Sequence, residues 1–134
     1  MTAEYSEHFV AFLDILGYKD LLETASCDEI VNIVNGLEKI KNLSKEYCGV
    51  PIEAYEHLNY KILSDKIVLF IDASINDSFP VLIDVCRRFQ TSLANRIKPV
   101  LLRGGITKGA VYYDDNAIFG DAPTQQYWLN AIRQ

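Results

Sequence analysis

Residues 58–71, LNYKILSDKIVLFI, constrain the fold of this 134-residue chain more than any other segment. The segment consists of two apolar runs, rich in isoleucine and leucine, on either side of Ser64 and Asp65. Apolar runs around a short polar pair predict a β-hairpin, although Ser-Asp is a weaker turn former than Asn-Gly or Asp-Gly. We therefore expect two antiparallel strands here, with Asp65 at the tip of the hairpin.

Two long segments have the spacing of amphipathic helices. In the first, Ser26 followed by Glu29 has the spacing of a capping box, and apolar residues then recur at positions 30, 33, 34, 37, 40 and 43. The second covers residues 79–97 and ends just before a proline. We also expect a short helix over residues 18–25 and a final helix over residues 124–133.

The remaining apolar runs predict strands over residues 8–16, over residues 100–113 with a bend near residues 108–109, and over residues 117–119. Gly17 ends the first of these strands, and Gly120 is expected to break the last. Helices that alternate with strands and one tight hairpin predict a single α+β domain over residues 1–134. We expect an α/β sandwich with a mostly antiparallel sheet and helices on one face, which leaves the other face for a ligand or a second subunit.

Composition excludes several classes of protein. The chain is 49% apolar and 23% charged, and it has no apolar run near the roughly 18 residues of a membrane span. A net charge of −5 argues against a nucleic-acid-binding surface, so a nucleotide would have to be held by metal ions or a local basic spot. The N-terminus has no secretory signal, and the three cysteines are far apart, so we expect a cytoplasmic protein with reduced thiols and no zinc site.

Asp14 and Asp65 are the candidate catalytic acids. Asp14 lies near the end of the first predicted strand, and Asp65 lies at the hairpin tip. If the two elements are neighbours, both carboxylates converge at one edge of the sheet, where a hard cation such as Mg²⁺ or Mn²⁺ would relieve their repulsion. The main-chain carbonyl of Ile15 or Leu16 would be a further ligand. The alternative is that Asp14 caps the following helix and Asp65 only makes a turn.

Three segments, FLDILGYKDLL, YKILSDKIVLF and LRGGITKGAVYYDDNAIFGDA, together resemble the catalytic domain of the class III nucleotidyl cyclases. The resemblance covers residues 9 to about 122 and is closest to the bacterial antiphage pyrimidine (uridylate or cytidylate) cyclases of the Pycsar type. The motifs that carry it are, in order, Asp14 to Tyr18, Ser64-Asp65, Arg103 to Gly109 and Phe119-Gly120.

This resemblance implies a ferredoxin-like fold and a homodimer with shared active sites. It also implies two Mg²⁺ or Mn²⁺ ions on Asp14, Ile15 and Asp65. The implied reaction is attack of the ribose 3′-hydroxyl of a nucleoside triphosphate on its α-phosphate, which releases pyrophosphate. UTP or CTP is the favoured substrate, cUMP or cCMP the product, and antiphage signalling the implied role.

Arg103 is the third candidate catalytic residue, as a ligand of the phosphates, and its alternative role is an ion pair at the sheet edge. Lys61 shares the face of Asp65 on a regular strand and is either a base contact or an exposed lysine. Tyr60 would face the opposite way unless a bulge intervenes, yet a tyrosine would suit pyrimidine recognition. The implied substrate-binding residues are Ile15, Leu16, Gly17, Tyr18, Tyr60, Lys61, Gly104 and Gly105, where the two glycines either allow close approach or mark a bulge.

Four hypotheses follow. The first is the cyclase. The second is a catalytically incomplete, cyclase-like nucleotide-binding or dimerisation module, because Ala117, Thr124 and Trp128 stand where purine cyclases carry polar base-reading and transition-state residues, and the chain ends at Gln134, before the last strands of a full domain. In that case we expect the chain to be a truncated product, a natural short form or one part of a split protein. The third, a diguanylate cyclase, is disfavoured because the hairpin lacks a GGDEF-type acidic motif. The fourth is a structural protein.

Overall fold

A computed structural model describes residues 3–43 and 52–120 of the chain. The predicted final helix over residues 124–133 lies outside this part, as do Thr124 and Trp128.

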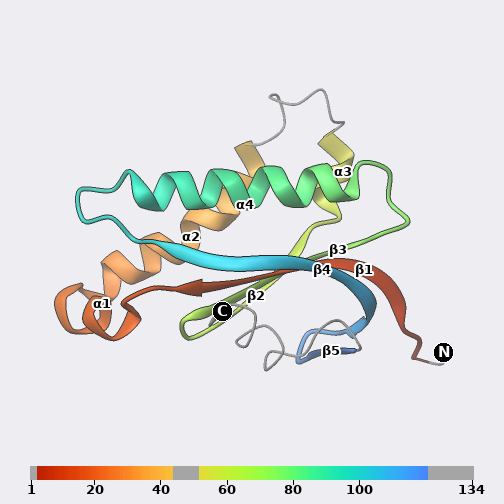
Figure 1. The fold of residues 1–134 in the computed structure, drawn as a ribbon, viewed down its shortest axis with the longest axis horizontal. Coiled ribbons are helices and arrows are strands. Elements are labelled where there is room, and N and C mark those ends of the chain that lie inside the picture. Colours follow the sequence, from red (N-terminus) through yellow and green to blue (C-terminus); the bar gives the residue numbers. More distant parts are fainter. Residues whose placement is uncertain (1–2, 44–51, 121–134) are drawn as a thin grey trace.

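The described residues form one five-stranded antiparallel sheet with the strand order β2-β3-β1-β4-β5 (Figure 1). The long strand β1 lies at its centre. The strands are β1 (Ser6–Ile15), β2 (Asn59–Leu63), β3 (Lys66–Asp72), β4 (Leu102–Tyr113) and β5 (Ile118–Gly120). The helices are α1 (Tyr18–Thr24), α2 (Cys27–Leu43), α3 (Ile52–Glu56) and α4 (Ser78–Ala94).

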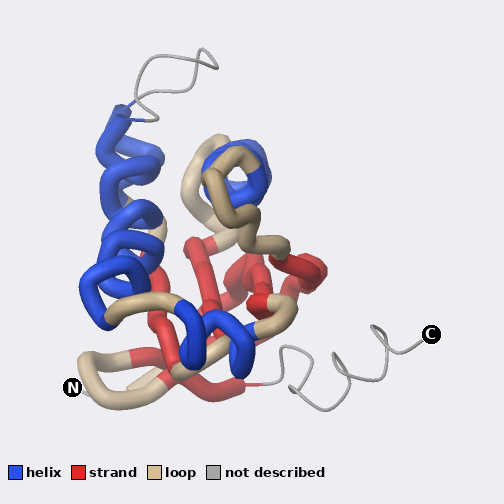
Figure 2. Tube along the Cα trace, turned by 90° about the vertical axis from the view of Figure 1, so that its left-hand side faces the viewer, coloured by secondary structure: helices blue, strands red, loops and turns tan. Residues whose placement is uncertain are grey.

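The helices α2 and α4 cover one face of the sheet, while β5 lies toward the other side (Figures 1 and 2). The predicted α/β sandwich is therefore confirmed, and every described strand pair is antiparallel. Three details differ from the expectation. The short helix α3 was not predicted, β4 continues through residues 108–109 without a bend in its pairing, and Gly120 is the last residue of β5 instead of the residue after it.

The start of α2 follows from its sequence. The main-chain amide of Glu29 donates a hydrogen bond of 3.2 Å to the Ser26 hydroxyl, which is one half of the predicted capping box. Asp28 and Glu29 lie in the first turn, where the helix dipole favours negative charge. Local chemistry therefore fixes where α2 begins.

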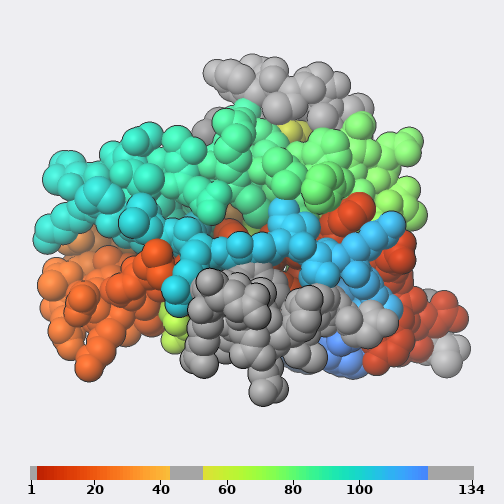
Figure 3. All heavy atoms as spheres, in the orientation of Figure 1, coloured from red at the N-terminus to blue at the C-terminus, as the bar shows by residue number. Residues whose placement is uncertain are grey.

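The main core lies between the sheet and the helices. Because side chains alternate along β1, Ala11 and Leu13 face the helices, while Val10 faces the other way. On the helix side they pack with α4 residues such as Phe89, and Figure 3 shows α4 lying directly against the sheet. On the other side Val10 forms a smaller cluster with Phe70 and Val111. Both faces of the sheet centre are therefore apolar, and polar side chains in the same strands stand out.

A buried carboxylate joins α3 to α4. Asp84 is 5% exposed and accepts a hydrogen bond of 2.8 Å from the Tyr55 hydroxyl. Arg87 and Arg88 bind the same carboxylate at 2.9 and 3.0 Å. Burial of the Asp84 carboxyl opposes its ionisation, but the hydrogen bonds from Tyr55, Arg88 and Arg87 outweigh this and lower its pKa. The cluster is a structural anchor that holds α3 against α4.

Candidate functional site

Three charged residues on three neighbouring strands form a row across the sheet. Asp14 of β1 is the register partner of Lys66 of β3 and also of Arg103 of β4. Partners in register on an antiparallel sheet point to the same face. Phe12, two residues before Asp14, packs on the face away from the helices, so the row lies on that open face. An acid therefore sits between two cations at the end of β1.

Asp14 is paired but not saturated. The Lys66 Nζ atom lies 3.9 Å from Oδ1 of Asp14, and the Arg103 Nη2 atom lies 3.5 Å from Oδ2. The Asp14 side chain is 14% exposed, whereas those of Lys66 and Arg103 are 32% and 49% exposed. Oδ1 of Asp14 is buried and has no hydrogen-bond partner. Both ion pairs are long, and at least one carboxylate oxygen keeps its capacity for a further ligand.

The hairpin tip is attached to the end of β1 through the main chain. The Ile15 amide donates a hydrogen bond of 2.9 Å to the carbonyl of Asp65, and the Leu16 amide donates one of 2.9 Å to the carbonyl of Leu101. These bonds place the turn of the hairpin directly beside the residue that follows Asp14. The expected proximity of the first strand and the hairpin is therefore present, and half-buried Asp65 lies in the Ser64-Asp65 turn.

Asp14 does not cap the next helix. The N-cap of α1 is Gly17, which has a left-handed backbone with φ of 69° and no side-chain hydrogen bond to the helix. Glycine adopts this conformation at little cost, so it makes the sharp turn from β1 into α1. The capping alternative for Asp14 is therefore wrong, whereas Asp65 does lie in a turn.

The residues at this edge fit a divalent cation that is shared with a ligand. Within residues 3–43 and 52–120 there is no group of three or more His, Cys, Asp or Glu side chains close enough to hold a metal by themselves. Mg²⁺, however, is commonly bound by one or two carboxylates together with phosphate oxygens and water. Asp14 supplies one carboxylate, and half-buried Asp65 comes directly before Lys66, the register partner of Asp14. This donor set suits an ion that arrives with a phosphorylated ligand.

Lys61 and Tyr60 lie on opposite faces of β2. Lys61 pairs in register with Val68, which belongs to the open face, so Lys61 shares the face of Asp14. Tyr60 packs against the core on the helix side, and its hydroxyl donates a hydrogen bond of 2.5 Å to Glu38 of α2. Burial of the hydroxyl, together with the Glu38 carboxylate, raises the pKa of Tyr60 to about 12. No bulge turns Tyr60 toward the charged row, and its role in binding stays a prediction.

Gly104 and Gly105 lie in regular strand. They pair with Leu13 and Phe12 of β1 without interruption, so the bulge alternative is wrong. Gly105 shares the open face with Phe12, and Gly104 faces the helices. Because Gly105 has no side chain, the main chain beside Arg103 is uncovered on the open face. A ligand could approach the backbone closely there.

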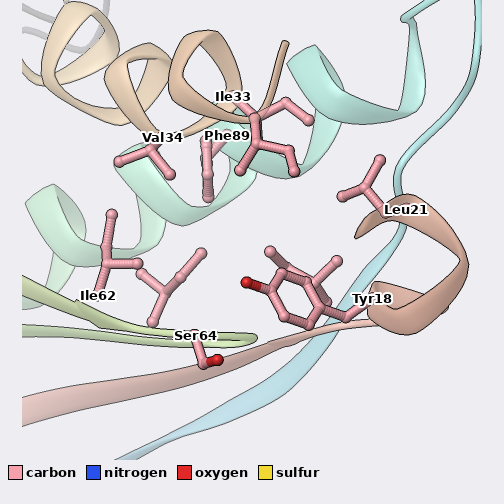
Figure 4. Close-up of a pocket in the computed structure, with 10 residues that line it drawn as sticks. Tyr18, Leu21, Ile33, Val34, Ile62, Ser64 and Phe89 are labelled. Carbon is pink, nitrogen blue, oxygen red and sulfur yellow. The ribbon is translucent and has the colours of Figure 1, made fainter. Parts of the chain in front are cut away.

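Sequence reasoning missed two features of this region, Lys66 and an apolar cavity. The cavity, of about 160 Å³, lies between α1, α2 and the hairpin (Figure 4). Figure 4 shows the Tyr18 ring reaching from the start of α1 toward the hairpin, with Ser64 at the other end. Its walls are Ile15, Tyr18, Leu21, Ile30, Ile33, Val34, Ile62, Ser64, Ile67 and Phe89. Lys66 could have been found by pairing strands 8–16 and 66–71 from the hairpin tip.

No protein-family model and no curated protein sequence matches this chain. The solved structures to which it is similar include two diguanylate cyclases. The active GGEEF domain of a diguanylate cyclase from Vibrio cholerae superimposes with a TM-score of 0.60 at 11% identity, over 96% of this chain and 78% of that one. Diguanylate cyclase SiaD from Pseudomonas aeruginosa, in complex with its activator SiaC, gives 0.49 at 18% identity, over 77% of this chain and 38% of that one.

The first of these similarities shows that the chain has a cyclase-like fold. The sequence disfavours the diguanylate cyclase hypothesis, because the hairpin lacks the acidic GGDEF-type motif and has Lys66 after Asp65. The fold likeness extends to the domain and not to this motif. None of the described helices is both long and apolar enough to cross a membrane.

Proposed function

We propose that the chain is a metal-dependent nucleotidyl cyclase that converts a nucleoside triphosphate into a 3′,5′-cyclic nucleotide and pyrophosphate. The observation that carries the proposal is the position of Asp14. It lies between two cations that it contacts only at 3.9 and 3.5 Å, beside the hairpin tip that bears Asp65. The motifs that resemble class III cyclases and the cyclase-like fold support the same conclusion.

The chain's own residues would hold the triphosphate against this edge. The Arg103 side chain is half exposed, and its guanidinium contacts Asp14 only at 3.5 Å. It can therefore turn toward a phosphate, which an arginine can bind through two parallel hydrogen bonds. At the turn from β1 into α1, Leu16 and Gly17 are exposed and Tyr18 is half-buried. The acidic chain thus carries the local basic spot that binding of a nucleotide requires.

Asp14 and Asp65 would hold Mg²⁺ or Mn²⁺ together with the phosphate oxygens. When bound, the metal neutralises triphosphate charge and lowers the pKa of the attacking 3′-hydroxyl. The protein positions the reacting groups, because phosphoryl transfer depends on alignment and on charge stabilisation more than on covalent chemistry. The resemblance adds a second ion, a main-chain ligand at Ile15 and a homodimer with shared sites.

The base preference rests on the resemblance to pyrimidine cyclases, which favours UTP or CTP and a role in antiphage signalling. Lys61 is the residue of β2 whose face allows it to contact a base above the charged row. Tyr60 faces α2. The same assay that tests cyclisation also decides the base and detects a dinucleotide product from GTP.

A second candidate function is a nucleotide-binding module without turnover. One observation favours it: both carboxylate oxygens of Asp14 already face a cation, and the described residues offer no third metal-ligating side chain. Such a module would gain thermal stability from nucleotide and metal and would form no cyclic product.

The deciding experiment incubates the full chain with each of the four nucleoside triphosphates and Mn²⁺ and resolves the products by mass. We expect one cyclic mononucleotide, and no product from Asp14→Asn or Asp65→Asn. Asp115→Asn is the matched control, because Asp115 is an exposed acid in the loop between β4 and β5. Wild-type turnover by Asp14→Asn, or no cyclic product from any triphosphate, would refute the cyclase. Stabilisation without product would support the binding module.

A further inference from the structure

The ammonium group of Lys66 occupies the position that a metal ion would take beside the buried oxygen of Asp14. Its Nζ atom lies 3.9 Å from Oδ1, and Oδ1 is buried with no hydrogen-bond donor. Mg²⁺ binds oxygen at about 2.0 to 2.1 Å and keeps several of its own waters. An ion with that shell needs open space around the oxygen that it binds. Oδ1, buried beside the lysine, does not offer this space.

Oδ2 of Asp14 is more accessible to a metal. Its partner is the Arg103 guanidinium at 3.5 Å, and the Arg103 side chain is 49% exposed, so it can move into solvent or onto a phosphate. Lys66 is more enclosed, with a side chain that is 32% exposed, and its main chain is fixed by strand pairing to Asp14 on one side and to Leu63 on the other. The carboxylate is therefore asymmetric, with a lysine on one oxygen and an open coordination position on the other.

The charges at this edge lead to the same conclusion. Asp14 and Asp65 contribute two negative charges, and Lys66 and Arg103 contribute two positive charges. One divalent ion then gives a net charge of about two positive, which equals that of two ions on two carboxylates without the lysine and arginine. A second ion next to Oδ1 would meet the ammonium of Lys66 at close range and be repelled.

We propose that this site takes one divalent ion, and that the ammonium of Lys66 replaces the second. This inference rests on the proposed function and differs from it only in the number of metal ions, which is one instead of two. Lys66 is a positioning residue here: it acts on the carboxylate of Asp14 and, through it, on the charge that meets the triphosphate.

The test counts bound ions instead of turnover. The full chain is dialysed to equilibrium with Mn²⁺ and a 3′-deoxynucleoside triphosphate, which lacks the attacking hydroxyl, with each of the four bases in turn. The retained metal and nucleotide are then quantified. We expect one Mn²⁺ per retained nucleotide for the wild type and for Lys66→Arg, which keeps the charge. We expect two for Lys66→Ala, which removes the ammonium and opens the space beside Oδ1.

Lys108→Ala is the control, because Lys108 lies on the helix side of β4 and pairs with Glu7 at 3.2 Å. It should retain one ion. Two ions on the wild type would overturn the inference and leave the cyclase intact. One ion on Lys66→Ala would also overturn it, since the lysine would then exclude nothing. Retention of nucleotide without Mn²⁺ would overturn both the inference and the metal requirement, and retention of no nucleotide would overturn the proposed function itself.

Discussion

The amide of Ile15 donates a hydrogen bond of 2.9 Å to the main-chain carbonyl of Asp65, and this bond joins the two segments that carry the candidate acids. Ile15 and Asp65, which are far apart in the sequence, are held together by this main-chain hydrogen bond. Substitution of either carboxylate should therefore leave the hairpin tip beside the end of β1. Changes in function at these positions can be interpreted as changes in chemistry.

We predict that Asp14→Asn abolishes cyclase turnover, by at least about 100-fold, because the neutral amide cannot offset positive charge on a metal ion. The free energy of unfolding should change by only about 1 kcal/mol, since both ion pairs are long and their cations are partly exposed. Turnover measured with Mn²⁺ and urea unfolding of the same preparation check the two statements. A large loss of stability together with turnover would assign Asp14 a structural role.

A base contact from β2 should come from Lys61. Lys61 faces the charged row, and Tyr60 faces α2. We predict that Lys61→Gln changes the preference between pyrimidine and purine triphosphates by about tenfold, the size expected when one polar contact to a base is lost. Tyr60→Phe should leave this ratio unchanged. The ratio of kcat/KM for UTP to kcat/KM for ATP measures this preference. A change of this ratio in Tyr60→Phe but not in Lys61→Gln would assign the base contact to Tyr60.

Tyr60 should instead stabilise the fold in a manner that depends on pH. Burial and the Glu38 carboxylate raise the pKa of Tyr60 to about 12, from 10.0 for an ordinary tyrosine. The raised pKa means that the stabilisation is complete below pH 10 and is lost as the pH rises from 10 to 12. Tyr60→Phe should therefore be less stable than the wild type at pH 8, and the difference should shrink above pH 10. Urea unfolding across this range tests it, with Tyr5→Phe, an exposed ring, as the control.

Asp84→Asn should destabilise the fold strongly without affecting nucleotide binding. Asp84 is buried and receives hydrogen bonds from Tyr55, Arg87 and Arg88, and loss of the charge removes its ion pairs with both arginines. We predict a loss of about 3 kcal/mol. Although burial opposes ionisation, the bonds lower the pKa of Asp84, so its stabilisation is present above pH 4 and is lost as the pH falls below it. The gap between variant and wild type in unfolding free energy should narrow below pH 4.

Much of the fold was predictable because local chemistry determines it. Ser26 and Glu29 mark the start of α2, and the apolar runs around Ser64-Asp65 give the hairpin as observed. The site was predictable only as far as strand pairing could be guessed. The importance of Lys66 follows from its register with Asp14, which neither residue encodes locally. The cavity between α1, α2 and the hairpin was not predictable, since it depends on how three separate elements pack.

Gly120 and Gly36 provide a matched pair of substitutions with opposite expected signs. A Cβ atom at Gly120 would lie 2.0 Å from the main-chain oxygen of Ala110 and 2.9 Å from the Cα atom of Val111, so Gly120→Ala forces β5 away from β4. A Cβ atom at Gly36, inside α2, meets nothing within 4 Å. We predict that Gly36→Ala stabilises the protein by about 1 kcal/mol through helix propensity.

Gly120→Ala should cost about 2 kcal/mol, as for other substitutions that force the backbone to move, unless the short β5 detaches. Detachment would appear as rapid hydrogen exchange at the amides of Tyr112 and Phe119, which form a hydrogen-bonded pair of the β4–β5 ladder. Urea unfolding and amide exchange on both variants measure these effects. Equal stability of the two variants, with the amides of the ladder still protected, would contradict the close approach of β5 to β4.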